Sequence, residues 1–281
     1  MKLLITGAAG MLGTDVQAAA RAAGHEVVAL TRAELDITDR DTVMGAVAAT
    51  QPDAIINCAA YTDVDGAESD PDAAGAVNAT GPGLLAEAAA AAGLWMVHVS
   101  TDYVFDGRKT TPYLESDPTG PRSVYGSTKL LGERAVAIAH PDRHTVVRSS
   151  WLFGSSGSCF PATMLRLAAG HDTLTVVDDQ RGCPTFTGHL APALVEMAAA
   201  QSLPGVVHVA ASGDCTWYEF AVEIMRATNP TVEVQPITTD QFPRPARRPA
   251  YSVLHSERPD APALPDWRRG LDEYLAVRVA P

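Results

Sequence analysis

The sequence predicts an α/β fold built on a doubly wound parallel sheet, with a smaller region formed by the C-terminal part of the chain. Short apolar runs alternate with Ala-rich helical stretches over the first half. These runs are continuously apolar, which is typical of parallel strands buried on both faces. A glycine-rich turn joins the first apolar run to the first helix, as in many doubly wound sheets.

The elements are expected to alternate from the N-terminus. Strands are expected over residues 2–6, 26–31, 54–57, 95–100 and 145–149. Helices are expected over residues 12–23, 39–50, 74–92 and 123–140, and further along at 189–201 and 216–228. Gly24 is expected to close the first helix in a left-handed conformation, and Thr38 or Asp39 to cap the second.

Beyond Trp151 the alternation becomes less regular, because prolines interrupt it and residues 235–249 are rich in Pro and Arg. We therefore expect two parts. Residues 1–150 would form the domain that carries the sheet. Residues 151–281 would form mainly a substrate-binding region, with segments that return to the sheet.

Composition and charge exclude several classes of protein. The 281 residues are 46% hydrophobic and 19% charged, which indicates a globular chain and not a disordered one. The net charge of −12 disfavours general binding to nucleic acid or to an anionic membrane. The four cysteines form no CxxC pair, and no segment looks like a signal peptide or a membrane span. We expect a cytoplasmic protein with free thiols.

Gly7, Gly10 and Gly13 follow the first strand in a GxxGxxG spacing. Glycine lets the backbone turn sharply and lets a pyrophosphate approach it. The helix N-terminus that follows offers free N–H groups and the positive end of its dipole. Strand, turn, helix and next strand stand in the order that a Rossmann-type dinucleotide site requires, so residues 1–150 are expected to bind NAD(P).

The end of the second strand carries the residues that would select the cofactor. Thr31 and Arg32 stand where an acidic residue would hold the 2′-hydroxyl of an adenosine ribose. A hydroxyl and a guanidinium suit a 2′-phosphate better, which favours NADPH, with NADH as the alternative. The competing interpretation is that Arg32 points into solvent and contacts no cofactor. Asp36 and Ile37 could hold the adenine through its amino group and its ring.

Tyr125 and Lys129 are four residues apart, so they share one face of the predicted helix. An ammonium beside a phenol lowers the phenol pKa, and the phenol can then pass a proton to a carbonyl oxygen. Thr101 follows the fourth strand, at the edge where parallel sheets bind ligands, and its hydroxyl could bind the same oxygen. These three residues predict carbonyl reduction or its reverse.

The chain resembles the extended short-chain dehydrogenase/reductase superfamily and, more closely, the dTDP-4-dehydrorhamnose reductase family. The matching motifs run from Thr6 to Leu275 and include TGAAGMLG, NCAAYTDVDGAE, VNATGP, VSTDYVFDG, SVYGSTKLLGE, VRSSWLFG and DDQRGCPT. The resemblance implies NAD(P)H-dependent reduction of the C4 ketone of dTDP-4-dehydro-L-rhamnose to dTDP-L-rhamnose. It implies a nucleotide-sugar substrate and permits a homodimer.

The same resemblance implies a role for each matching residue. Tyr125 would be the general acid, Lys129 would hold the nicotinamide ribose, and Thr101 would assist at the carbonyl. Asp102 and Trp151 would contact the sugar. The cofactor would be lined by residues that follow the first and third strands: Gly7, Gly10, Met11, Leu12, Gly13, Ala59, Ala60, Tyr61 and Thr62.

Two positions depart from the family pattern. Cys58 replaces a common alanine, and Asp15 replaces a glutamate that helps some members bind a divalent ion, so no metal is expected. Arg244, Arg247 and Arg248 form the densest basic cluster in an acidic chain. At least one of them could bind a diphosphate, because guanidinium groups bind phosphate in a forked geometry; a solvated loop is an equal alternative.

Other side chains with ligand-like patterns have ordinary explanations. His140 and His144 flank Pro141 and are expected in a polar loop. Trp217 and Tyr218 are expected to pack in a core. Two further functions stay open: a 4-ketoreductase of another dTDP-deoxysugar in secondary metabolism, or a non-catalytic regulatory subunit with a reductase-like fold.

Overall fold

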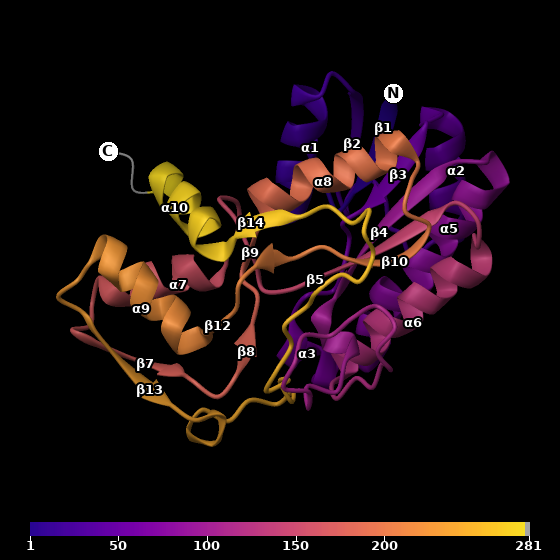
Figure 1. Ribbon diagram of the computed structural model, residues 1–281. Coiled ribbons are helices and arrows are strands. Elements are labelled where there is room, and N and C mark those ends of the chain that lie inside the picture. The colour runs from indigo at the N-terminus through magenta and orange to yellow at the C-terminus, as the bar shows by residue number, and fades with distance from the viewer. Residues whose placement is uncertain (279–281) are drawn as a thin grey trace.

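The computed structural model describes residues 1–278. Six parallel strands form the central sheet in the order β2–β1–β3–β4–β5–β10 (Figure 1). They are β1 (Lys2–Thr6), β2 (Glu26–Leu30), β3 (Ala54–Asn57), β4 (Trp95–Thr101), β5 (His144–Ser149) and β10 (Gly205–His208). The first five match predicted strands, and β10 adds an edge strand from the C-terminal part of the chain. The predicted doubly wound parallel sheet is confirmed.

Helices cover both faces of the sheet. On one face lie α1 (Met11–Ala22) and α8 (Thr187–Ala200); on the other lie α2 (Arg40–Thr50), α5 (Gly81–Ala92) and α6 (Val124–Ala139). Side chains of β1 alternate between the two faces: Leu3 and Ile5 pack with α1 and α8, and Leu4 packs with the opposite layer. All three are fully buried, which explains why the strand is continuously apolar.

Local sequence determines where several helices begin and end. Asp39 caps α2 by accepting from two backbone N–H groups of its first turn, and Gly24 closes α1 with a φ of 77°. The helix predicted over 74–92 is divided into α4 (Pro71–Gly75), the π-helical turn η1 (Ala76–Thr80) and α5. Residues 64–69 form a further short helix, α3 (Val64–Ser69), which was not predicted.

The C-terminal part builds a second core beside the sheet, at the left of Figure 1. Its helices are α7 (Phe160–Ala168), α9 (Trp217–Thr228) and α10 (Trp267–Arg278), and its strand pair is β7 (Thr173–Val177) with β13 (Glu233–Ile237). Three shorter pairs are β6 (Leu152–Phe153) with β9 (Thr185–Phe186), β8 (Arg181–Gly182) with β12 (Cys215–Thr216), and β11 (Ala211–Ser212) with β14 (Leu264–Asp266). Buried aromatic rings, among them Phe153, Phe220 and Trp267, fill this core.

Candidate active site

The predicted site residues lie at the carboxyl edge of the sheet. The loops that leave β1 to β5 all emerge at this edge, because the strands are parallel. Gly7 follows β1, Ala59 follows β3, Thr101 ends β4 and Trp151 follows β5. The first turn of α6 brings Tyr125 to the same edge, where its ring contacts the residues after β4.

The glycine turn has the geometry that a dinucleotide requires. Gly7 has a φ of 66°, and a Cβ placed on it would lie 2.6 Å from the backbone nitrogen of Ala59. A Cβ on Gly13 would collide with the carbonyl oxygen of Gly7. α1 begins after Gly10 without a side-chain cap, so its first N–H groups are open to a pyrophosphate. The residues at this turn therefore fit an NAD(P) pyrophosphate.

Replacing Gly7 by Ala is expected to weaken NADPH binding more than tenfold. A left-handed backbone costs a residue with a Cβ about 1–2 kcal/mol, and the contact with Ala59 forces the turn to shift. Fluorescence titration with NADPH measures the effect. Gly24→Ala is the matched control, because its φ is 77° but a Cβ there would meet nothing within 4 Å. Equal affinities of the two variants would contradict the prediction.

The end of β2 holds a carboxylate that the sequence analysis did not single out. Glu34 accepts hydrogen bonds from the backbone N–H and the hydroxyl of Thr31, at 2.9 and 2.8 Å. Arg32 is exposed next to this turn. Asp36 accepts hydrogen bonds within its own turn, and Ile37 is buried against the start of α5. The turn thus offers a guanidinium for a 2′-phosphate and a carboxylate for a 2′-hydroxyl.

Asn78 is a second residue whose role the sequence analysis missed. It is fully buried in η1. Its amide accepts from the backbone N–H of Tyr61 at 2.8 Å and donates to the carbonyl oxygen of Tyr61 at 3.0 Å and to the Thr128 hydroxyl at 3.2 Å. Asn78 therefore fixes the loop after β3, with Ala60 and Thr62, against α6. A π-helical turn is a recognised mark of functional sites, but it becomes visible only in the structure.

Tyr125 lies beside the end of β4, with its ring edge-on to that of Tyr103 at a centroid distance of 5.5 Å. Burial raises the pKa of Tyr125 to about 12, against the lowering effect of the Thr101 hydroxyl. The sequence analysis expected this pKa to be lowered; it is raised instead, because burial disfavours the phenolate and the charge of Asp102 adds to that effect. The phenol consequently stays protonated at neutral pH and is able to donate its proton.

Asp102 is buried at the end of β4 with one oxygen unpartnered. Its Oδ1 accepts from the Thr101 hydroxyl at 3.0 Å, whereas Oδ2 has no hydrogen-bond partner among the described residues. Burial raises the pKa of Asp102 to about 6, against the effects of the Ser252 and Thr101 hydroxyls. A buried polar atom without a partner, next to Tyr125, is typical of a group that meets a ligand.

Lys129 lies one helical turn beyond Tyr125 and is only 2% exposed. Its Nζ donates to the carbonyl oxygen of Val99 on β4 at 2.7 Å. Burial lowers the pKa of Lys129 to about 8, so the ammonium is charged at neutral pH and loses its proton in mildly alkaline solution.

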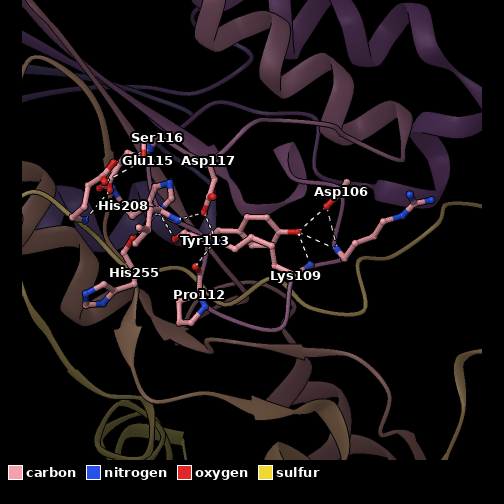
Figure 2. Close-up of polar contacts among 12 residues, drawn as sticks. Asp106, Lys109, Pro112, Tyr113, Glu115, Ser116, Asp117, His208 and His255 are labelled. Atoms are coloured by element: carbon pink, nitrogen blue, oxygen red, sulfur yellow. Dashed lines mark hydrogen bonds and ion pairs between the residues drawn. The ribbon is translucent and has the colours of Figure 1, made fainter.

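The loop after β4 is held by the polar network of Figure 2. The Tyr113 hydroxyl donates to Asp106 at 2.8 Å and accepts from the backbone N–H groups of residues 108 and 109. The backbone N–H of His208, on β10, donates to Glu115 at 2.7 Å, and that of His255 donates to the Tyr113 carbonyl at 2.9 Å. Two segments from the C-terminal part therefore hold the loop that begins at the end of β4.

A cavity of 1170 Å³ lies between the second core and the end of β4. Its walls come from α7, β7, α9, Tyr103 and residues 237–250. Trp217 lines it and stacks on Trp151, with ring centroids 3.5 Å apart and planes at 3°. Trp151 has a φ of 49°, which a residue other than glycine rarely adopts, and such strain concentrates at functional sites. Trp217 thus contributes to the cavity as well as to the core expected for it.

The three arginines of the basic cluster have two different environments. Arg248 donates to Asp65 on α3 at 2.8 Å, and Arg244 forms an ion pair with the same carboxylate at 3.2 Å. These contacts fasten residues 237–250 to the sheet domain. Arg247 lines the cavity and has no ion pair within residues 1–278. It is therefore the member of the cluster that is best placed for an anionic ligand.

The remaining candidates have structural roles. The polar loop expected for His140 and His144 is not observed: His140 ends α6, His144 begins β5, and both are buried with hydrogen bonds to backbone carbonyl oxygens at 2.7 and 2.6 Å. The Asp15 carboxylate accepts from the hydroxyl of Thr187. Across residues 1–278 no group of three His, Cys, Asp or Glu side chains could hold a metal ion. In the same part of the chain, no helix has both the length and the apolar character of a membrane span.

Comparison with known proteins identifies the family. A family model described as RmlD substrate binding domain matches residues 1–279. The dTDP-4-dehydrorhamnose reductase of Mycolicibacterium smegmatis is 46% identical, over 99% of this chain and 86% of its own length. A probable dTDP-4,6-dihydroxy-2-methyloxan-3-one 4-ketoreductase of Streptomyces antibioticus is 44% identical, over 97% of this chain and 94% of its own.

A solved structure shows the same architecture. The dTDP-4-dehydrorhamnose reductase of Bacillus anthracis, in complex with NADP, is similar with a TM-score of 0.95 and 35% identity, and the match covers 98% of this chain and 99% of that one. The fold, the sequence motifs and the matches to these relatives indicate the same family over nearly the whole chain. The chain therefore belongs to the RmlD substrate binding domain family, together with dTDP-4-dehydrorhamnose reductases.

Proposed function

We propose that the protein is an NADPH-dependent reductase that converts the C4 ketone of dTDP-4-dehydro-L-rhamnose to the alcohol of dTDP-L-rhamnose. The observation that carries the proposal is the half-buried, protonated Tyr125 beside Thr101, in contact with Tyr103, which lines the 1170 Å³ cavity. Incubation with this substrate and NADPH, followed by NMR of the nucleotide sugar, tests it. Formation of dTDP-L-rhamnose supports the proposal, and an unchanged ketone would refute it.

In this mechanism the side chains at the end of β4 act on the carbonyl oxygen. A bound reduced nicotinamide supplies the hydride that the C4 carbon accepts. Thr101 donates a hydrogen bond that orients the oxygen, and Tyr125 transfers its phenolic proton to it. Lys129 holds a ribose hydroxyl of the cofactor, and its positive charge stabilises the phenolate that proton transfer leaves behind.

The second part of the chain binds the nucleotide sugar. We assign the sugar to Asp102, which is next to Tyr125, and to Trp151, which stacks on the cavity residue Trp217. The nucleoside diphosphate occupies the cavity beyond Trp217, where Arg247 meets its negative charge. The cavity volume of 1170 Å³ is larger than the roughly 300–1,000 Å³ of most small-molecule sites, which leaves room for a nucleotide sugar.

Replacing Arg247 by Ala is expected to raise the KM for the nucleotide sugar about tenfold or more, with little change in kcat. A charge-assisted hydrogen bond to a phosphate is worth roughly 1.5–3 kcal/mol, and the diphosphate is remote from the reacting carbon. Steady-state kinetics measure both constants. Arg244→Ala is the control, because Arg244 is already engaged by Asp65; an equal KM for both variants would remove Arg247 from the site.

A 4-ketoreductase of another dTDP-deoxysugar is the second candidate. One relative with 44% identity carries such a description, so overall identity does not separate the two substrates. Comparison of kcat/KM for dTDP-4-dehydro-L-rhamnose and for dTDP-4,6-dihydroxy-2-methyloxan-3-one discriminates them. A non-catalytic regulatory subunit would consume NADPH with neither substrate.

The preference for NADPH rests on Arg32 at the end of β2, whereas Glu34 in the same turn favours NADH. We propose NADPH as the preferred cofactor, with measurable activity with NADH. A cytoplasmic location and a homodimer stay predictions of the sequence analysis, and sedimentation of the purified protein tests the second.

A further inference from the structure

α6 presents three functional side chains to the sheet at successive turns. Tyr125, Lys129 and Glu133 are four residues apart, so they share one face of the helix. Tyr125 lies at the edge of the sheet, Lys129 is below it, and Glu133 is one turn deeper. The first two belong to the proposed reaction, whereas Glu133 has no role in it so far.

Glu133 is held in one orientation by two neighbouring strands. Both of its oxygens accept from the Arg148 guanidinium, at 2.9 and 2.7 Å, and Oε1 also accepts from the Ser100 hydroxyl at 2.5 Å. Ser100 on β4 and Arg148 on β5 are partners in the sheet register. The side chains of Glu133 and Arg148 are each only 5% exposed. Arg148 also lies over the ring of Phe105, 5.1 Å from its centroid, so the guanidinium is fixed as well.

The titratable groups that face Lys129 come from three elements. Cys58 follows β3, and burial raises the pKa of its thiol to about 12, so it is neutral. His98 on β4 is neutral too, because burial lowers its pKa. Glu133 on α6 is thus the anion that supports the Lys129 charge, and it raises the pKa of Lys129 against the effect of burial. The ammonium donates to a neutral carbonyl oxygen and makes no ion pair of its own among residues 1–278.

We propose that Glu133 is a positioning residue for the reaction: its carboxylate, oriented by Arg148 and Ser100, keeps the buried Lys129 ammonium charged beneath Tyr125. The inference rests on the proposed function for its meaning in the reaction. The charge of Lys129 itself can be measured without any substrate or cofactor.

The chain offers a direct measurement, because it contains only three lysines, Lys2, Lys109 and Lys129. In protein labelled with lysine carrying 13C at Cε, each side chain gives one resonance whose shift reports its protonation. Lys129→Arg assigns the signal. Wild-type protein is expected to show one lysine that titrates at about 8. Lys2, at the surface, is the internal reference.

The test variant is the double replacement Glu133→Gln with Arg148→Met, which removes both charges and leaves no buried charge unpaired. The Lys129 midpoint is expected to fall by about one pH unit, because the variant loses the Glu133 charge, which raises the pKa of Lys129. Arg40→Met with Glu87→Gln is the control, since it removes an exposed pair of opposite charges and adds no lysine signal, and its Lys129 midpoint should stay within a few tenths of a unit. If the double variant does not fold, Glu133→Asp replaces it. The Lys129 titration midpoint is then expected to fall by a smaller amount.

The alkaline limb of kcat/KM for ketone reduction is expected to move with the Lys129 midpoint. An unchanged midpoint, or a midpoint that moves while the alkaline limb stays in place, would overturn the proposal. Absence of any turnover by the wild-type protein would instead refute the proposed function, and the NMR titration would still decide whether Glu133 supports the charge.

Discussion

Tyr125→Phe is expected to lower kcat for ketone reduction by about 10²- to 10⁴-fold, the usual contribution of a positioned proton donor. The phenol is protonated because burial holds its pKa near 12, and its ring lies edge-on to Tyr103, so phenylalanine fits the same space. The loss should therefore appear in kcat, while the affinity for NADPH stays within about threefold of wild type. Steady-state kinetics and fluorescence titration measure the two quantities.

Tyr103→Phe is the matched control for this experiment. The two rings are in contact, and both side chains are half-buried, but only Tyr125 shares the face of α6 with Lys129. A small effect at position 103 together with a large effect at position 125 would identify the proton donor. Full turnover by Tyr125→Phe would show that the proton comes from another group, for which the buried Asp102 is the next candidate.

Glu133→Gln alone is expected to lower the free energy of unfolding by about 3–5 kcal/mol, because it leaves the Arg148 guanidinium buried without its counter-charge. The two side chains lie between α6 and the sheet, with 5% exposure each, so water cannot replace the lost carboxylate. Urea unfolding at pH 7 measures the change as a lower midpoint with an unchanged slope.

The double variant with Arg148→Met should recover most of this loss, because no buried charge then remains unpaired. Equal destabilisation of the single and the double variant would show that packing, and not the unpaired charge, accounts for the effect. Arg40→Met with Glu87→Gln provides the comparison at the surface. That ion pair is exposed and is expected to contribute less than about 1 kcal/mol.

Much of the fold could be predicted from periodicity and from residues at the ends of elements. The strands at 2–6 and 54–57 were predicted with their observed bounds, because each contains three consecutive apolar residues and is followed by turn or loop residues. β7 and β13 were not predicted. They pair only with each other, several of their side chains are exposed, and the apolar pattern is correspondingly weak. Their position depends on packing against α9, which is distant in sequence from β7.

The same distinction applies to the site. Gly7, Tyr125 and Lys129 were identified because their spacing within one turn or one helix is enough to indicate their role. Asn78 and the Glu133–Arg148 pair were missed, because their partners lie on other elements and only the folded chain brings them together. The error on the pKa of Tyr125 has the same origin, since its burial cannot be seen in the sequence.

The most direct test of the account is NADPH consumption in the presence of dTDP-4-keto-6-deoxyglucose, with and without a 3,5-epimerase. The epimerase converts the D-configured ketone to the L-configured substrate of the proposed reaction. Loss of NADPH absorbance only when the epimerase is present, with dTDP-L-rhamnose as product, is the result we predict. Equal consumption without the epimerase would indicate a reductase of the D-sugar, and no consumption under either condition would contradict the account.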